Sequence, residues 1–177
     1  MSDKIRGFKA VSRCWDMFQA DGGHRVLPKR STKNSAGYDF FAVEDIVIPS
    51  HLEEWIKNFK LMRSDGCSRG TVKPFCIKTG VKAYMQDDEV LQLYIRSSSP
   101  GKLGLILANS VGIVDSDYYD NPDNEGEIGF LVYNLSFQDV HIHQGDKIGQ
   151  GVFTKYLKID EDVTENERIG GFGSTGV

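Results

Sequence analysis

The chain has 177 residues, of which 40% are hydrophobic, and a formal net charge of −4. Its length predicts one domain that buries roughly 70% of the surface of the unfolded chain, and the acidic balance argues against nucleic acid as a partner because phosphate backbones require a basic surface. No apolar run approaches the ~20 residues of a membrane span, and three cysteines without a Cys-x-x-Cys pair suit neither a disulfide framework nor a zinc site, so we expect a cytoplasmic protein with free thiols and no membrane contact.

Short runs of β-branched and aromatic residues recur along the chain between its 19 glycines. This pattern predicts a mostly-β domain with frequent turns, and strands of this length and spacing favour a jelly roll or a sandwich. The candidate strands are residues 46–48, 76–81, 90–95, 103–107, 112–114, 128–133, 140–143 and 148–153.

One helix is predicted, at about residues 51–62. Ser50 and Glu53 form the Ser-x-x-Glu capping pattern at its start. Packing of its apolar face on the sheet is the simpler interpretation, and docking of a partner protein is the alternative. That apolar face consists of Leu52, Trp55, Ile56 and Phe59.

A polar segment, Arg96-Ser97-Ser98-Ser99, follows the candidate strand at 90–95. A guanidinium fork and several hydroxyl groups at the end of a strand can hold a phosphate. Serine-rich turns are common, so the serines alone would indicate only a turn. The arginine makes a phosphate-binding loop the more specific interpretation.

A second polar cluster ends the candidate strand at 112–114. Asp115 could orient a water as a general base, with Tyr118 beside it as a flat surface. The alternative is a polar turn that closes a hairpin. Residues 120–127 are acidic but lack the glycine and the ligand spacing of an EF-hand loop, so we interpret them as a solvated loop rather than a calcium site.

The remaining candidates lie near the C-terminus. His141 and His143 could share a strand face, but without a visible third ligand they indicate solvated side chains rather than a metal site. Residues 145–150 read as a turn into a strand, with Gln150 as a polar contact. The last nine residues contain four glycines around Phe172, which is typical either of a frayed end or of a mobile segment that closes over a phosphate ligand.

Taken together, five segments of the chain resemble the ordered motifs of the trimeric dUTPase family. The order and the composition of the five motifs make the resemblance specific, whereas other nucleotide-binding and hydrolase patterns do not appear. The motifs are Ala36-Gly37-Tyr38-Asp39-Phe40, Arg96-Ser97-Ser98, residues 109–118, residues 145–150, and the Gly-Gly-Phe-Gly-Ser-Thr-Gly tail.

The resemblance implies an all-β, jelly-roll-like subunit over residues 1–165 with an inserted helix, and a mobile C-terminal arm at 166–177 that closes the active site. It also implies a homotrimer with shared active sites and hydrolysis of dUTP to dUMP and pyrophosphate. Such an activity limits uracil incorporation into DNA and supplies dUMP for thymidylate synthesis.

The roles of individual residues follow from the same resemblance. Asp115 matches the aspartate that orients the attacking water, and Tyr118 matches the tyrosine packed under the deoxyribose, which disfavours a ribose. Asp39 matches the aspartate near the Mg²⁺ shell, through water. The remaining matches are Asn109, Gly112 and Val114 for uracil, Arg96, Ser97, Ser98 and Gln150 for phosphates, Phe172 for stacking on uracil, and Arg168, Gly173 and Ser174 for further phosphate contacts.

Two segments depart from the family pattern. Residues 51–75 and 119–125 are inserted relative to it and look like surface additions, the first of which could bind a protein partner. A dCTP deaminase remains a rival on the same fold, although Leu131 stands where that enzyme needs a proton-transferring glutamate. A dUTP-sensing regulatory protein that presents the helix to a partner is the other alternative.

Overall fold

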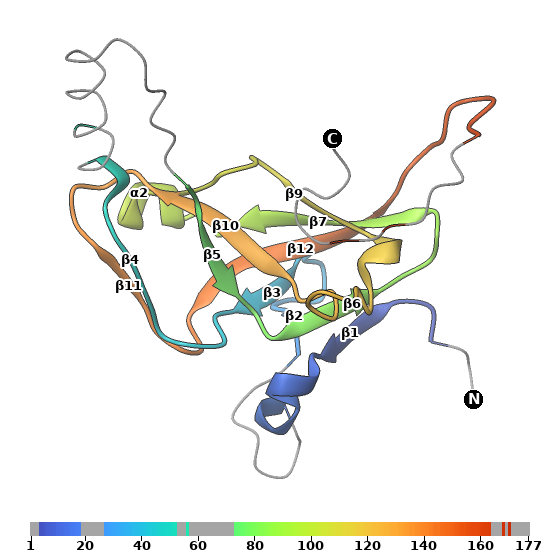
Figure 1. The fold of residues 1–177 in the computed structure, drawn as a ribbon, viewed down its shortest axis with the longest axis horizontal. Helices are drawn as coiled ribbons and strands as arrows, with labels where there is room; N and C mark the ends of the chain where they lie inside the picture. Colours follow the sequence, from blue (N-terminus) through green and yellow to red (C-terminus); the bar gives the residue numbers. More distant parts are fainter. Residues whose placement is uncertain are drawn as a thin grey trace.

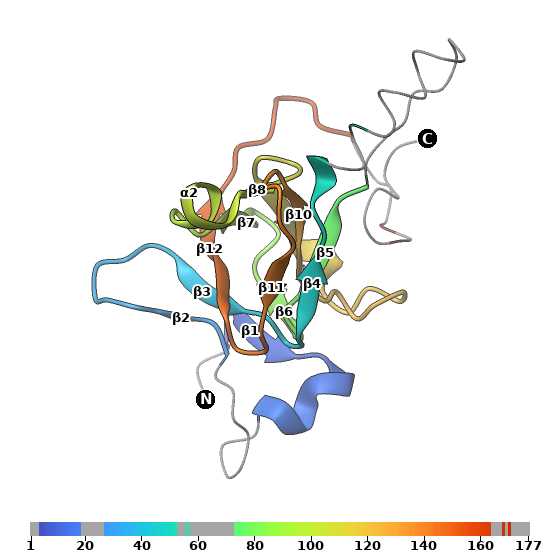
Figure 2. The ribbon, with the colours of Figure 1, turned by 90° about the vertical axis from the view of Figure 1, so that its left-hand side faces the viewer.

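Two layers of β-sheet form the body of the molecule in the computed structural model, which describes residues 4–18, 27–52, 56, 73–163, 168 and 170. Viewed end-on, β12 and β3 lie in one layer and β4 and β5 in the other (Figure 2). The elements are β1 Gly7–Ala10, η1 Ser12–Phe18, β2 Lys29–Arg30, β3 Tyr38–Phe41, β4 Ile46–Ile48, β5 Phe75–Lys78, β6 Val81–Tyr84, β7 Glu89–Ile95, α2 Ser99–Leu103, β8 Leu105–Leu107, β9 Gly112–Asp115, η2 Ser116–Tyr118, β10 Gly129–Asn134, β11 Val140–Ile142 and β12 Lys147–Lys155.

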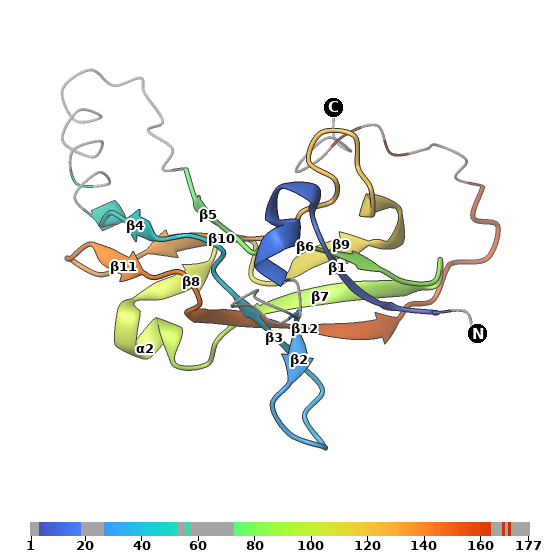
Figure 3. The same cartoon turned by 90° about the horizontal axis from the view of Figure 1, so that it is seen from below.

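The largest sheet has five strands in the order β2-β3-β12-β7-β9. Its two long strands, β7 and β12, run antiparallel from the Gly149–Ile95 pair to the Lys155–Glu89 pair. The second layer contains the sheet β5-β10-β8 and the pair β11-β4, while β1 pairs with β6. η1 lies beside this last pair (Figure 3), where the Val11 amide donates to the Gly80 carbonyl at 2.9 Å.

The core fills the space between the layers. Phe40 and Leu91 come from the five-stranded sheet and Phe130 and Leu105 from the three-stranded sheet, and all four are almost fully buried. The rings of Phe40 and Phe130 meet across the layers with centroids 5.7 Å apart. Burying each such side chain contributes roughly 1.5–3 kcal/mol, so the alternation of apolar and polar residues holds the two sheets together.

The all-β, jelly-roll-like fold predicted from the sequence is confirmed, and six candidate strands correspond to β4, β7, β9, β10, β11 and β12. The prediction of one strand over 76–81 is wrong, because Gly80 adopts φ +71 and turns the chain from β5 into β6. The strand predicted at 103–107 begins late, since Leu103 ends helix α2 and Gly104 caps that helix in a left-handed conformation. The sequence analysis did not identify β1, β2, β3 or β6.

Two predicted segments fall largely outside the described residues. Of the helix at 51–62, only residues 51, 52 and 56 are described, and all three are helical. Of the C-terminal arm, only Arg168 and Gly170 are described. Among the cysteines in the described part, Cys14 and Cys76 are reduced thiols outside any disulfide bond. Within that part, no helix has both the length and the apolar character to cross a membrane.

Candidate active site

The candidate site residues fall into two groups at opposite ends of β7. Arg96 follows the last residue of this strand, whereas Asp115 pairs with Val90 near its first residue. At about 3.3 Å per residue, the six steps along the chain from Val90 to Arg96 correspond to about 20 Å. Figure 1 shows the same separation, with α2 beyond one end of β7 and the turn that follows β9 at the other. We refer to these regions as the Arg96 end and the Asp115 end.

Strand pairing assembles the Arg96 end from three elements. Gln150 of β12 is paired with Asp39 of β3 on one side and with Tyr94 of β7 on the other. The Arg96 amide donates to the Ile148 carbonyl at 3.2 Å, which continues the β7–β12 ladder by one residue. The chain then turns at residues 97–98 and enters α2 rather than continuing as the expected loop.

Gly37 allows the Gln150 side chain to lie across the start of β3. A Cβ at position 37 would stand 2.8 Å from Cδ of Gln150 and closer still to its Oε1 atom. Gly37 is itself buried. The glycine of the first motif therefore has a steric function, since any larger residue would displace the amide of Gln150.

Asp39 is an ionised, largely buried carboxylate. Its Oδ2 atom accepts a hydrogen bond from Lys147 Nζ at 2.7 Å and another from the Ser31 hydroxyl. Burial alone would raise the pKa of Asp39, but the hydrogen bonds from Lys147 and Ser31, with the charges of Lys147 and Arg96, lower it below its ordinary value. Asp39 therefore keeps its negative charge beside the arginine.

At the Asp115 end, a cation lies between two carboxylates. Asp115 ends β9 with a side chain that is 49% exposed. Arg168 forms an ion pair with Asp115 and also donates from Nε to Asp117 Oδ1 at 2.8 Å. Its guanidinium lies over the Tyr118 ring, 5.7 Å from the centroid. Arg168 thus contacts both the candidate general base, Asp115, and the candidate sugar-packing ring, Tyr118.

Tyr118 is buried, with 6% of its surface exposed. Its Oη atom accepts a hydrogen bond from Nδ2 of Asn124 at 2.7 Å. Burial raises the pKa of Tyr118, and the hydrogen bond from Asn124 opposes part of this rise. The ring therefore lies in a fixed place with a neutral hydroxyl group.

Asn109 lies in the connection between β8 and β9, and Gly112 and Val114 belong to β9. β8 pairs with β10, whereas β9 is the edge strand next to β7. The two strands that this connection joins therefore belong to different sheets. The outer edge of β9 presents main-chain donors and acceptors of the kind that can read a planar base.

Within the described part of the chain, the charged groups do not form a preassembled metal cage. The described ranges contain no group of three histidine, cysteine or acidic side chains that could hold an ion. Asp39 could still contact the water shell of Mg²⁺, because this ion keeps several waters and often binds through substrate phosphates and one or two carboxylates. The residues thus fit an ion carried by a phosphate ligand rather than an ion held by the protein alone.

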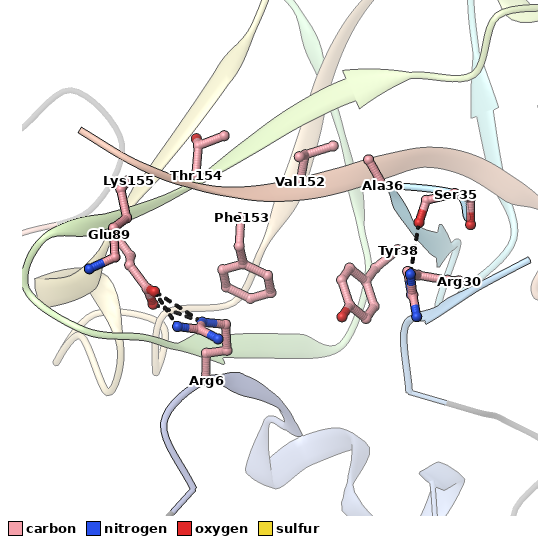
Figure 4. Close-up of a pocket in the computed structure, with 10 residues that line it drawn as sticks. All are labelled: Arg6, Arg30, Ser35, Ala36, Tyr38, Glu89, Val152, Phe153, Thr154 and Lys155. Atoms are coloured by element: carbon pink, nitrogen blue, oxygen red, sulfur yellow. Dashed lines mark hydrogen bonds and ion pairs between the residues drawn. The ribbon is translucent and has the colours of Figure 1, made fainter. Parts of the chain in front are cut away.

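A pocket of about 460 Å³ lies elsewhere, along β12 (Figure 4). Its floor includes the rings of Tyr38 and Phe153. Its cation Arg6 is engaged with Glu89, and Arg30 donates to the main chain at Lys33 and Ser35. The lining includes none of the predicted catalytic or binding residues, and these cations already have partners, so the pocket is a poor candidate for the catalytic centre.

The structure thus brings Asp39, Arg96, Ser97, Ser98 and Gln150 to one end of β7, and Asp115, Tyr118 and Arg168 to the other. Phe172, Gly173 and Ser174 lie outside the described residues. Lys147 and Asn124 were not predicted as site residues, although Lys147 belongs to the segment 145–150, which matches one of the motifs. The interpretation of 120–127 as a solvated loop is wrong in part, because Asn121 and Glu127 are buried.

Comparisons with known proteins point to one family. A family model described as dUTPase matches residues 67–176. The deoxyuridine 5'-triphosphate nucleotidohydrolase of Lactococcus lactis is 43% identical over 175 residues, which cover 98% of this chain and 99% of that protein. The enzyme of the same name from Helicobacter pylori strain Shi470 is 33% identical over 86% of this chain and 90% of its own length.

Solved structures show the same fold. The crystal structure of dUTPase from Streptococcus mutans superposes with a TM-score of 0.68 at 38% identity, covering 87% of this chain and 98% of that chain. A mutant dUTPase from phage phi11 of S. aureus, described with a structural Mg(II) ion, gives a TM-score of 0.59 at 17% identity, covering 92% and 98%. At that identity, the phage structure supports the fold alone.

Proposed function

The chain belongs to the dUTPase family, and on this premise we propose that it hydrolyses dUTP to dUMP and pyrophosphate through the residues at the two ends of β7. The reaction removes a precursor of uracil in DNA and supplies dUMP for thymidylate synthesis. The cytoplasm suits a chain with reduced thiols at Cys14 and Cys76. The observation that carries the proposal is the half-exposed carboxylate of Asp115 beside the buried ring of Tyr118.

Asp115 orients the attacking water. The water oxygen forms a bond to the α-phosphorus, the bond from this phosphorus to the oxygen that bridges to the β-phosphorus breaks, and pyrophosphate leaves. The carboxylate of Asp115 accepts the proton that the water loses. Arg168 contacts the same carboxylate, so substrate binding requires this arginine to exchange Asp115 for a phosphate oxygen.

The Arg96 end binds the phosphates. Arg96 supplies a planar pair of donors, Ser97 and Ser98 supply hydroxyl and amide donors, and Gln150 supplies an amide held over Gly37. When Mg²⁺ is bound to the triphosphate, it neutralises the charge that develops on the phosphate oxygens. Asp39, which Lys147 and Ser31 keep ionised, would hold that ion through its water shell.

Selectivity resides in β9 and the turn around it. The main chain at Gly112 and Val114 and the side chain of Asn109 bind the edge of uracil, and Tyr118 packs under the deoxyribose. A site that pairs buried polar groups with one base rejects an analogue that leaves them unpaired. Phe172 stacks on the base, and Gly173 and Ser174 contact phosphates when the C-terminal arm closes and excludes water.

The separation of about 20 Å within one subunit supports a shared site. A triphosphate is shorter than this distance, so its α-phosphorus cannot contact Asp115 and the Arg96 end of the same chain at once. A second copy that places its Asp115 end against the first copy's Arg96 end removes the difficulty, and repetition around a threefold axis gives a closed trimer with three such sites.

The test of this function is pyrophosphate release from dUTP, dCTP, dTTP and UTP in the presence of Mg²⁺, with ammonia measured in the dCTP sample. We expect release from dUTP and at least about 100-fold less from the other three nucleotides. Ammonia from dCTP would instead indicate the deaminase branch of the fold, despite the leucine at position 131. Absence of any turnover with retained dUTP binding would indicate a regulatory protein.

A further inference from the structure

The segment after Tyr118 folds back onto this residue. Asn124 donates from Nδ2 to Tyr118 Oη at 2.7 Å and accepts at Oδ1 from the Gly126 amide at 3.0 Å. The second bond fixes which end of the Asn124 amide is oxygen, and therefore which end meets the tyrosine. The hydroxyl of Tyr118 thus contacts a side chain that is itself oriented by the main chain.

The same segment holds the main chain of Tyr118. The Asn121 amide donates to the Tyr118 carbonyl at 3.2 Å, and the Glu125 amide donates to the Asn121 carbonyl at 2.7 Å. Gly126 has φ +76, and a Cβ on this residue would overlap the Tyr118 carbonyl oxygen. Glycine is therefore required at this position for the segment to close on Tyr118.

Ion pairs and hydrogen bonds anchor the segment to the rest of the subunit. Lys82 of β6 pairs with Asp120 and, at 3.4 Å, with Glu125. Glu125 also accepts from the amide and the hydroxyl of Ser12, the latter at 2.8 Å. The Lys82 ammonium lies 5.1 Å from the centroid of the Tyr119 ring. Contacts on both sides of Asn124 make the segment a support rather than a solvated loop.

We infer that Asn124 is a positioning residue for sugar discrimination, which it exerts by fixing the ring of Tyr118. The inference rests on the proposed function, in which this ring packs under the deoxyribose. To reject a ribose because of its one extra hydroxyl group, the ring of Tyr118 must not move aside. Supporting residues that leave the ring about 1 Å of freedom would lose this discrimination. The hydrogen bond from Asn124 restricts the movement of the ring at its hydroxyl end.

The test compares kcat/KM for dUTP and for UTP in Asn124→Ala. We expect the dUTP-to-UTP ratio to fall about tenfold, mainly through a gain with UTP. Asn124→Asp should restore most of the ratio, because its carboxylate can accept from both Gly126 N–H and Tyr118 O–H. Lys158→Ala, at an exposed position outside this segment, is the control and should leave the ratio unchanged.

A double-mutant cycle with Tyr118→Phe tests the route of the effect. Tyr118→Phe lacks the hydroxyl, so adding Asn124→Ala to it should change the ratio no further. If the two substitutions change the dUTP-to-UTP ratio independently and additively, the inference is overturned. An unchanged ratio in folded Asn124→Ala would overturn it as well. If Asn124→Ala fails to fold, Asn124→Ser replaces it. Failure of the proposed function is distinguishable, because the unmutated protein would then show no preference for dUTP.

Discussion

The two ends of β7 differ in how their charges are balanced. At the Arg96 end, the carboxylate of Asp39 is paired with Lys147 at 2.7 Å and is largely buried. At the Asp115 end, Asp115 and Asp117 are about half exposed and share one cation, Arg168. One end is thus stabilised by elements of the central sheet, and the other depends on a residue from the C-terminal arm.

Under the proposed function, we expect this difference to separate phosphate binding from turnover. Three paired strands, β3, β7 and β12, position the residues of the Arg96 end, which suits a phosphate site. In the proposed function, Arg168 leaves Asp115 when substrate binds, so this carboxylate changes its environment at that point, which suits a step that must wait for substrate. Substitutions at the Asp115 end should therefore reduce turnover, and those at the Arg96 end should weaken binding.

Asp115→Asn should cause the largest effect. The amide is nearly isosteric but cannot accept the proton of the attacking water, so we expect kcat for dUTP to fall about 10³-fold. Binding of a non-hydrolysable dUTP analogue, measured by calorimetry, should stay within a few-fold of the unmutated protein. A kcat within tenfold of the original value would remove Asp115 from the mechanism.

Arg96→Gln should produce the complementary defect. Loss of the charged, two-pronged contact with phosphate should lower kcat/KM about 100-fold, chiefly through a higher KM. Steady-state kinetics across a range of dUTP concentrations separate the two constants. A fall in kcat with unchanged KM would show that the two ends of β7 do not divide the work in this way.

Gly37→Ala should have a smaller effect at the Arg96 end. The added methyl group would displace the Gln150 side chain, so we expect kcat/KM to fall about tenfold and stability to fall by about 1 kcal/mol. Gly101→Ala is the matched control, because nothing lies within 4 Å of a Cβ at that position in α2. Equal kinetics in the two variants would contradict the steric function of Gly37.

Lys147→Gln should have the smallest effect, visible in the pH dependence of stability. Because the folded pKa of Asp39 is lowered, its ionised form stabilises the fold above the unfolded value of about 3.9, and this contribution is lost as the pH falls through the folded pKa. Lys147→Gln should therefore cost about 1 kcal/mol at pH 7 and less at pH 3. Urea unfolding at one protein concentration measures the cost in stability at each pH. An equal cost at the two pH values would contradict the pairing of Lys147 with Asp39.

Much of the architecture could be predicted because burial leaves a local pattern. Strands such as β7 and β10 carry long apolar runs that predict them directly. β1 and β3 are short and rich in glycine or aromatic residues next to polar ones, and they are stabilised by pairing with distant strands. Such non-local pairing leaves little signal in the segment itself.

The site was less predictable than the fold. The residue types at Asp115 and Arg96 indicate chemistry, but their separation along β7 depends on the strand register, which no motif contains. Asn124 lies in an acidic segment, and only the tertiary contact with Tyr118 distinguishes it from a solvated asparagine. The roles assigned to Phe172, Gly173 and Ser174 stay predictions.

We propose that each active site combines the Arg96 end of one subunit with the Asp115 end of another. Asp115→Asn and Arg96→Gln chains with different affinity tags, co-expressed and purified through both tags in succession, give trimers that contain both variants. In each such trimer one of the three interfaces has both ends intact, so we expect about one third of the activity of the unmutated protein. Activity no higher than that of the two parent variants would place the whole site within one subunit and contradict the account.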